Sequence, residues 1–329
     1  MLATTYLITP MTLKLASPGL RRRASMARSG ARAPTHSLTC LRAVVITGVS
    51  PVSLGGTLAQ NIARHGPAKL ILASHSVANM REVAQSITSS QAPCTPDIVK
   101  VNLASLASIR MAAKTIAELT QEVHLLINTA AVIPSDRRVT EDGFEMQFGV
   151  THLGHFLLTE LLMPQLKRAS LSSPLAKGSV RVVNISSLSH EMSPFRFTDY
   201  NFEVQKLFRL PSPIQYQVFV AYGQSKTANV LHSVELTRRF FDTDGIRSFA
   251  LMPGKRKALD IGARGKWITP DQGTATILVA ALDPALDGTH IENIYLDACQ
   301  FKQAASHARD ERLARRLWEL NCRLDLTTS

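Results

Sequence analysis

Short apolar runs alternate with amphipathic segments along most of the chain. Seven of the runs have the length and the β-branched composition of buried strands. Apolar residues at helical spacing fill the segments between them. This alternation predicts an α/β fold in which helices cover both faces of one doubly wound, mainly parallel sheet. The seven expected strands fall near residues 43–47, 69–73, 98–102, 123–127, 180–186, 246–251 and 291–296.

The elements follow one another without a linker rich in Pro, Gly or Ser and without an internal repeat. A last helical stretch, from about Ala304 to Cys322, places Leu313, Leu317 and Leu320 on one side, which suits packing against the body of the protein or a partner. The 329 residues, 45% hydrophobic and 19% charged, are enough for one large domain. We therefore expect a single domain at residues 43–323.

The first strand runs directly into a glycine-rich turn. Ala43-Val-Val-Ile-Thr-Gly48 has the composition of a buried strand, and the turn up to Gly56 is rich in Gly, Ser and Pro. Glycines let the backbone approach a diphosphate, and the start of the following helix offers N–H groups and a positive dipole end. The combination predicts a Rossmann-type dinucleotide site.

Tyr222 and Lys226 stand four positions apart in the run Ala221-Tyr-Gly-Gln-Ser-Lys226. On a helix these positions share a face, so we expect the lysine charge to lower the pKa of the phenol and make it a usable proton donor or acceptor. The same spacing is also found on an amphipathic surface helix with a solvated lysine. It gains weight only from other motifs.

Five such motifs follow in a fixed order along the chain. They are Thr47-Gly48 with Gly55, Asn128-Thr-Ala-Ala131, His152-Leu-Gly-His-Phe156, Val182-Val-Asn-Ile-Ser-Ser187 and Pro253-Gly254. With Tyr222 and Lys226 they resemble the short-chain dehydrogenase/reductase family, and within it the retinol-dehydrogenase-like enzymes and their fungal relatives. The resemblance extends from about Ala43 to about Trp318.

This resemblance implies hydride transfer between a nicotinamide and a carbon that bears oxygen, with proton transfer at that oxygen. Tyr222 would carry the proton, Lys226 would stabilise its phenolate and hold the nicotinamide ribose, and Ser187 would hydrogen-bond the substrate oxygen. A serine at the end of a strand also caps turns, so Ser187 has a structural alternative. Thr151 stands where the family has an asparagine thought to order a water of the proton relay.

Several positions depart from the family pattern on the cofactor side. Val52 replaces the middle glycine of the nucleotide loop, Ala131 replaces a glycine, and residues 255–259 replace the usual apolar residues and threonine after the Pro-Gly turn. A branched side chain at Val52 opposes the approach of phosphate. The residues expected at the cofactor are Gly48, Ser50, Val52, Leu54, Gly55, His75, Asn102, Asn128, Ala130, Tyr222, Lys226, Pro253 and Gly254.

The choice between NAD(H) and NADP(H) depends on the end of the second strand. A carboxylate there would bind the ribose 2′-hydroxyl of NAD and repel a 2′-phosphate, but no Asp or Glu occurs between Met1 and Arg81. His75 stands where NADP-using relatives often carry arginine, although it also suits an ordinary polar loop. Asn102 replaces an aspartate beside the adenine and retains an amide for one hydrogen bond. The charge argument favours NADP(H).

The net charge of +12 comes mostly from one end of the chain. Residues 1–81 contain ten Lys or Arg and no acid, whereas the remaining 27 basic and 25 acidic residues nearly cancel. We interpret 1–42 as a basic, disordered extension, with an organelle-targeting peptide or a misassigned start at Met26 as alternatives. Nucleic acid is not an expected partner. No apolar run is long enough for a membrane span, and we expect a cytoplasmic protein.

The cysteines and histidines do not indicate a metal or redox site. Cys40, Cys94, Cys299 and Cys322 are scattered, without a CxxC pair or a nearby histidine at ligand spacing. His152 and His155 belong to the motif of the expected central helix. They are interpreted as packing or polar-network residues rather than ligands.

The segment from Leu188 to Ala221 separates Ser187 from Tyr222 and contains a cluster of aromatic residues. One interpretation is a bulge over the cleft that lines an apolar pocket for a bulky or aromatic ketone, aldehyde or alcohol, as in the specialised metabolism of fungal relatives. The other is a surface flap with its own small core. The departures at the cofactor leave a second function open, a catalytically weak nucleotide-sensing or partner-binding protein. A homodimer through the two long helices beside the site is compatible with the resemblance.

Overall fold

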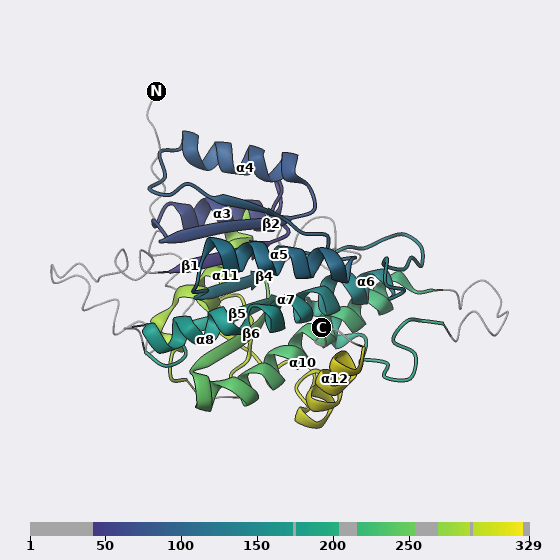
Figure 1. Cartoon of the computed structure of the whole chain (residues 1–329). Helices are drawn as coiled ribbons and strands as arrows, with labels where there is room; N and C mark the ends of the chain where they lie inside the picture. The colour runs from purple at the N-terminus through teal and green to yellow at the C-terminus, as the bar shows by residue number, and fades with distance from the viewer. Residues whose placement is uncertain (1–41, 174–175, 204–215, 254–268, 290–291, 325–329) are drawn as a thin grey trace.

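The computed structural model describes residues 42–173, 176–203, 216–253, 269–289 and 292–324. Its strands form one sheet in the order β3-β2-β1-β4-β5-β6-β7-β8, parallel except for the last pair (Figure 1). The expected doubly wound α/β fold is therefore confirmed. The strands are β1 Ala43–Thr47, β2 Lys69–Ser74, β3 Asp97–Lys100, β4 Leu125–Asn128, β5 Val180–Ile185, β6 Ile246–Met252, β7 Tyr295–Asp297 and β8 Gln300–Phe301.

The described sheet has eight strands rather than the seven expected. β8 pairs antiparallel with β7, with Leu296 opposite Phe301. The turn between them is tight, because Ala298 and Cys299 both adopt left-handed backbone angles, with φ of 50° and 63°. A strand of two residues contains no period-2 pattern, which is why the apolar runs did not indicate it.

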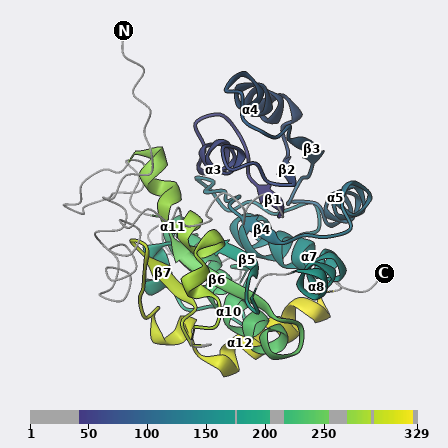
Figure 2. The ribbon, with the colours of Figure 1, turned by 90° about the vertical axis from the view of Figure 1, so that its left-hand side faces the viewer.

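Helices cover both faces of the sheet (Figure 2). One face packs against α3, α4 and α11, and the other against α5, α7 and α10. Along β1, Val44 and Ile46 belong to the first core and Val45 to the second, as expected for a strand that is buried on both sides. None of the described helices is long and apolar enough to cross a membrane. The helices are α3 Leu54–Ala63, α4 Val77–Ser89, α5 Leu106–Leu119, α6 Met146–Phe148, α7 Gly154–Leu161, α8 Met163–Ser172, α10 Val218–Asp244, α11 Pro270–Leu282 and α12 Glu311–Arg323.

The crossing order of the strands creates the place for a ligand. β1 pairs with β2 on one side and with β4 on the other, so the chain changes direction between β1 and β4. In doubly wound sheets, ligands bind beyond the carboxyl ends of the strands at such a point. β1, β4, β5 and β6 are mutually parallel, so the residues that follow them lie at one edge.

The last helix packs against the body of the protein. In α12, Leu317 and Trp318 are buried, and Leu313 and Leu320 pack partly buried against the same core, as the sequence predicted. The Trp318 ring lies edge-on to Phe156 of α7, with centroids 5.0 Å apart. Figure 1 shows α12 beside α10, one of the long helices through which pairing was expected. The homodimer itself stays a prediction.

The boundary of the N-terminal extension is displaced by one residue. Residues 1–41 lie outside the described part of the chain. Arg42, which was assigned to the extension, is instead buried, and its Nη1 donates to the Ala281 carbonyl 3.1 Å away. Arg42 directly precedes β1 and its side chain is buried in the domain, so the folded domain includes residue 42.

A cluster of buried arginines lies at the amino ends of β1, β5 and β6. Arg181 and Arg247 are fully buried, and Arg42 is nearly so. Burial and the charge of Arg181 lower the pKa of Arg42 and of Arg247 to about 10, while Asp287 raises both. Asp287 also forms an ion pair with Arg181. Asp287 thus offsets the repulsion among three guanidinium groups, and Asp283 adds to this effect at Arg181.

We expect Asp287→Ala to lower the free energy of unfolding by about 3 kcal/mol, because it removes the compensating charge from a buried cluster. Denaturant unfolding at pH 7 measures the change. Asp242→Ala is the matched control: Asp242 pairs with Lys177, but both side chains are at least half exposed, so its removal should change stability by less than about 0.5 kcal/mol. Equal losses in the two variants would contradict the assignment of Asp287.

Candidate functional site

The turn after β1 is packed as tightly as a phosphate-binding loop requires. Gly48 has a φ of +67°, and a Cβ there would lie 2.7 Å from the Cα of Ala130, at the end of β4. A Cβ on Gly55 would lie 2.7 Å from the Gly48 carbonyl, and one on Gly56 would lie 2.2 Å from the Ser50 carbonyl. The expected roles of Gly48 and Gly55 fit this geometry. The sequence analysis did not predict a role for Gly56 in this turn. The two adjacent glycines, Gly55 and Gly56, were the signal that could have indicated it.

Ser53 organises the same turn and begins helix α3. Its Oγ accepts from the backbone N–H of Ser50 and Gly56, at 3.0 and 2.9 Å, and donates to the Ser50 carbonyl at 2.7 Å. Ser50 and Leu54 are thereby held at the helix start. A serine directly before a helical pattern is an N-cap signal, which the sequence analysis did not use.

Val52 adopts the backbone conformation that glycine would have. Its φ is 58°, in the left-handed region, and its side chain is 83% exposed at the tip of the turn. For a residue other than glycine this conformation costs about 1–2 kcal/mol. The loop therefore has the backbone shape that a glycine would give, at the expense of local strain. That the isopropyl group obstructs a phosphate stays a prediction.

Ser187, Tyr222 and Lys226 come together at the carboxyl end of β5. Ser187 follows β5 by two residues, and its side chain is close enough to that of Tyr222 on α10 to favour a lower pKa of the phenol. The Lys226 Nζ lies 5.3 Å from the centre of the Tyr222 ring and donates to the Ile185 carbonyl at 3.0 Å. The Ser187 Oγ also accepts from the N–H of Ser189 and caps a short 3-10 helix, Leu188–Glu191. The structure shows the capping role of Ser187, and its catalytic role stays a prediction.

The expected effect of Lys226 on Tyr222 is wrong for this structure. Burial raises the pKa of Tyr222 to about 12, and only the hydrogen bond with Ser187 opposes the shift. Burial also lowers the pKa of Lys226 to about 7, because the ammonium group is fully enclosed. Near neutral pH the lysine therefore carries only part of a charge, and desolvation outweighs its attraction for a phenolate. The phenol is firmly protonated.

Thr151 lies in a π-helical turn, Gly149–Leu153, between α6 and α7. Such turns are frequent at functional sites because they redirect side chains and carbonyls. The Thr151 Oγ1 is buried and has no hydrogen-bond partner among the described residues. A buried, unpaired hydroxyl is a position where a water or a ligand group would bind. The relay role of Thr151 stays a prediction.

His155 connects this turn to the nucleotide loop. Its Nδ1 donates to the Thr151 carbonyl at 3.0 Å, and its Nε2 lies 2.9 Å from the Thr47 Oγ1. That hydroxyl also accepts from the N–H of Thr129 and of Ala130. Burial lowers the pKa of His155 to about 4, so the ring is neutral and its Nε2 accepts from Thr47. His152 has hydrogen-bond partners as well, so both histidines are polar-network residues, as expected.

The other residues expected at the cofactor lie at or just after the carboxyl ends of strands, but their side chains differ in exposure and in hydrogen bonding. His75 is exposed after β2, and Pro253 is half-buried after β6. The side chain of Asn128 is turned into the core, where its Nδ2 donates to Asn184 at 2.9 Å. The Asn102 amide donates to Glu141 at 3.0 Å. Gly254 and residues 255–259 lie outside the described residues.

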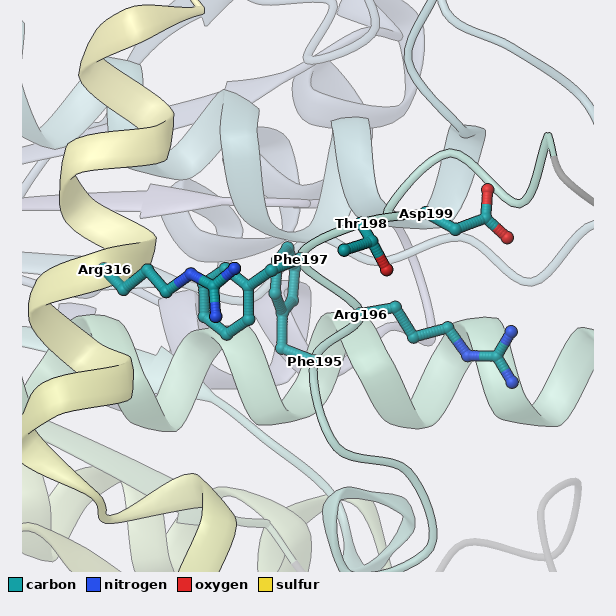
Figure 3. A pocket seen from close by; sticks show the side chains of 6 residues that line it. All are labelled: Phe195, Arg196, Phe197, Thr198, Asp199 and Arg316. Carbon is teal, nitrogen blue, oxygen red and sulfur yellow. The ribbon is translucent and has the colours of Figure 1, made fainter.

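Part of the segment before Tyr222 forms a small aromatic core. Phe195 and Phe202 are buried, and the Phe195 ring packs against Phe148 at 5.2 Å and Phe197 at 4.8 Å. Phe195 and Phe148 belong to the same core as the residues of α5, α7 and α10, so this part of the segment rests on the body of the protein. Both interpretations of the segment stay predictions, and residues 204–215 lie outside the described residues. A hollow of about 390 Å³ lies on this segment. Figure 3 shows its lining side chains, with Arg316 of α12 beside Phe197, and the Arg316 guanidinium lies 4.2 Å from the centre of the Phe197 ring. The predicted catalytic residues do not line it. Its lining residues are Phe195, Arg196, Phe197, Thr198, Asp199 and Arg316.

A buried carboxylate fixes the start of α10, which the sequence did not reveal. Glu145 is fully buried and accepts from the N–H of Gln147 and Phe148, which begin α6. The Tyr216 hydroxyl donates to the Glu145 Oε1 at 2.6 Å, and the Gln147 Nε2 donates to the Val218 carbonyl at 2.9 Å. This network ties the first turn of α10 to the helix that leads into Thr151.

Comparisons with known proteins agree with this site. The family model described as short chain dehydrogenase matches residues 42–201. Retinol dehydrogenase 11 from Homo sapiens is 32% identical over 332 residues, covering 97% of this chain and 95% of that protein. Oxidoreductase fscI from Fusarium equiseti is 36% identical over 239 residues, covering 68% and 86%. An uncharacterised protein from Mycobacterium Paratuberculosis has a similar structure, with a TM-score of 0.66, 28% identity and coverage of 86% and 92%.

The fold and the site define an oxidoreductase that uses a nicotinamide nucleotide. The chain belongs to the short-chain dehydrogenase family, in the branch that contains the retinol dehydrogenases.

We expect Val52→Gly to tighten the binding of a nicotinamide nucleotide by about tenfold, because it removes a branched side chain from the phosphate approach. Titration followed by the fluorescence of the reduced cofactor measures the affinity. Stability should stay the same or rise by up to about 1 kcal/mol, since relief of strain is partly offset by the flexibility of glycine. Val52→Ala, which keeps the strained backbone, is the control. Unchanged affinity in Val52→Gly would show that Val52 does not obstruct the phosphate.

Proposed function

We propose that the protein is an NADP(H)-dependent oxidoreductase that interconverts a ketone or aldehyde and an alcohol. The observation that carries this proposal is the grouping of Ser187, Tyr222 and Lys226 at the carboxyl edge of the sheet, beside the turn that contains Gly48. A proton donor and a hydrogen-bond donor for one oxygen atom thereby stand next to a nucleotide site.

In this reaction the nicotinamide supplies or accepts the hydride. The Tyr222 hydroxyl transfers the proton to or from the substrate oxygen, and the Ser187 hydroxyl polarises that oxygen by a hydrogen bond. The pKa of Tyr222, raised to about 12 by burial, keeps the phenol protonated at neutral pH. A protonated phenol acts as an acid, which supports the reducing direction from carbonyl to alcohol. Thr151 would hold the water through which Tyr222 is reprotonated.

The residues of the nucleotide loop fit a dinucleotide. The turn is closed tightly around Gly48, and α3 presents its N-terminus to the space above the loop. The residues at the end of β2 support NADP(H) over NAD(H), because His75 is exposed there and Lys100 of β3 pairs in register with Ser74. Two basic residues thus lie at the end of β2, where a 2′-phosphate would bind.

Apolar side chains around the catalytic residues support a bulky apolar or aromatic substrate. Leu188 directly follows Ser187, Met192 ends the same 3-10 helix, and Phe219 lies one helical turn before Tyr222, and all three are exposed. Exposed apolar groups beside a catalytic site favour ligands that bury them. The name of the human relative specifies retinol, an apolar alcohol. A cytoplasmic location and a role in specialised metabolism stay predictions.

We expect Tyr222→Phe to abolish turnover, by at least about a thousandfold, while the affinity for NADPH changes less than about threefold. A panel of apolar ketones and aldehydes with NADPH measures turnover, and fluorescence titration measures binding. Tyr200→Phe, which removes the hydroxyl of a half-buried phenol outside the catalytic group, is the control and should retain turnover. Full activity of Tyr222→Phe would refute the proposed chemistry.

The nucleotide-sensing or partner-binding function stays the second candidate because Val52 strains the cofactor loop. It predicts that the unaltered protein binds NADPH but turns over no carbonyl in the panel. The enzyme predicts turnover in the same assay, so a single experiment separates the two.

We expect NADPH to bind at least about tenfold more tightly than NADH, because His75 and Lys100 attract the 2′-phosphate. Lys100→Ala should weaken NADPH and leave NADH unchanged, and His75→Asp should reverse the preference. Lys114→Ala, which removes an exposed lysine from α5, is the control for net charge. Equal binding of the two cofactors to the unaltered protein would contradict the choice of NADP(H).

A further inference from the structure

A continuous line of hydrogen bonds connects the C-terminal helix to the lysine of the catalytic group. The Asn321 Nδ2 of α12 lies 3.0 Å from the His152 Nε2, in the π-helical turn. The His152 Nδ1 lies 3.2 Å from the Asn229 Oδ1, on α10. The Asn229 Nδ2 donates to the Ile185 carbonyl at 3.0 Å, and this carbonyl is also the acceptor of the Lys226 Nζ.

All donors and acceptors along this line agree in direction. The amide of Asn321 donates, so the Nε2 of His152 accepts and its Nδ1 carries the proton that the Asn229 oxygen receives. This tautomer requires a neutral ring, and burial lowers the pKa of His152 to about 3. With its oxygen engaged by His152, Asn229 can present only its amide hydrogens to the Ile185 carbonyl.

The line is enclosed in the protein along its whole length. Asn321, His152 and Asn229 are at most 2% exposed, as is Lys226. The His152 ring is also stacked on Phe148, with centroids 5.5 Å apart and an angle of 19° between the planes. Because water is excluded, rotation of any one of these side chains would leave a buried polar atom without a hydrogen-bond partner. The arrangement therefore resists such rotation.

We propose that Asn229 and His152 are positioning residues for Lys226, and that α12 takes part in this positioning through Asn321. The inference rests on the proposed function, in which Lys226 belongs to the catalytic group beside Tyr222. Asn229 fixes the Ile185 carbonyl, and that carbonyl is the hydrogen-bond acceptor that holds the Lys226 Nζ near the Tyr222 ring. Asn229 and Lys226 share an acceptor at 3.0 Å each, so their nitrogen atoms lie within about 6 Å of one another.

The protonation of Lys226 can be followed without substrate or cofactor. Burial lowers its pKa to about 7, whereas lysine in an unfolded chain titrates near 10.4. Between these values the unfolded chain binds the extra proton, so the free energy of unfolding rises as pH increases from about 7 to about 9.5. The titratable groups that face Lys226 are Tyr222 and His155, which titrate above and below this window.

Asn229→Asp keeps the shape of the side chain and the acceptor for His152, but places a carboxylate near the Lys226 ammonium. The carboxylate favours the charged lysine and so raises the pKa of Lys226. We therefore expect the free energy of unfolding to begin its increase at a pH at least about one unit higher. Lys226→Met should remove the rise altogether. Thr243→Glu, which adds a carboxylate at the exposed end of α10, is the matched control and should leave the rise in place.

Asn321→Leu tests the contribution of α12 through turnover. We expect kcat for carbonyl reduction to fall at least about fivefold, with a displaced pH profile and less than about a twofold change in the substrate KM. Glu319→Gln, on the exposed side of the same helix, should behave like the unaltered protein.

The two proposals fail in distinguishable ways. An unaltered protein that turns over no carbonyl would overturn the proposed function, while the pH dependence of unfolding would still decide whether Asn229 controls Lys226. An Asn229→Asp profile that coincides with the unaltered one would overturn the positioning role, even in an active enzyme. An Asn321→Leu variant with unchanged kcat and pH profile would overturn the part assigned to α12.

Discussion

The burial of the Lys226 ammonium is the constraint on which the site depends. A charge enclosed in protein is costly unless hydrogen bonds compensate it, and the Ile185 carbonyl provides that compensation at 3.0 Å. The carbonyl belongs to the last residue of β5, so β5 and α10 must be held in register. Gly223 makes the contact close enough, because a Cβ there would lie 2.5 Å from the Ser189 carbonyl. The turn that begins at Ser187 is thereby pressed against the helix that bears Tyr222.

At two positions that depart from the family pattern, Val52 and Thr151, the main chain maintains the shape of the site. Val52 changes the side chain of the nucleotide loop but retains a left-handed backbone, and the loop is held from below by Thr47 and His155. Thr151 is shorter than an asparagine, but the π-helical turn changes the direction in which it points. The left-handed backbone at Val52 and the π-helical turn at Thr151 are both main-chain features, and both keep the local geometry despite the changed side chain.

Features with a local signal could be predicted from the sequence, and those that arise from tertiary contacts could not. The long apolar runs gave seven strands and the parallel sheet, whereas β8 was too short to show a period. The spacing of Tyr222 and Lys226 gave their common helix face. It did not give the pKa of Tyr222, because burial is a property of the whole fold. Likewise, Asn128 looked like a ligand residue, but its side chain faces Asn184 across neighbouring strands.

The distribution of strain favours an enzyme over a sensor that has lost its chemistry. A site released from catalysis has no reason to retain costly buried polar groups, since replacing them with apolar residues is often neutral or stabilising. Here Lys226, His152 and Asn229 are all enclosed, and each is matched with a partner of the correct donor or acceptor type. Among the residues of the nucleotide loop, Val52 is the one with a left-handed backbone that is not glycine, and it lies at the rim of the loop, away from these buried groups. The buried polar groups around Lys226 are thus paired, while the departure from the family pattern lies at the exposed tip of the loop.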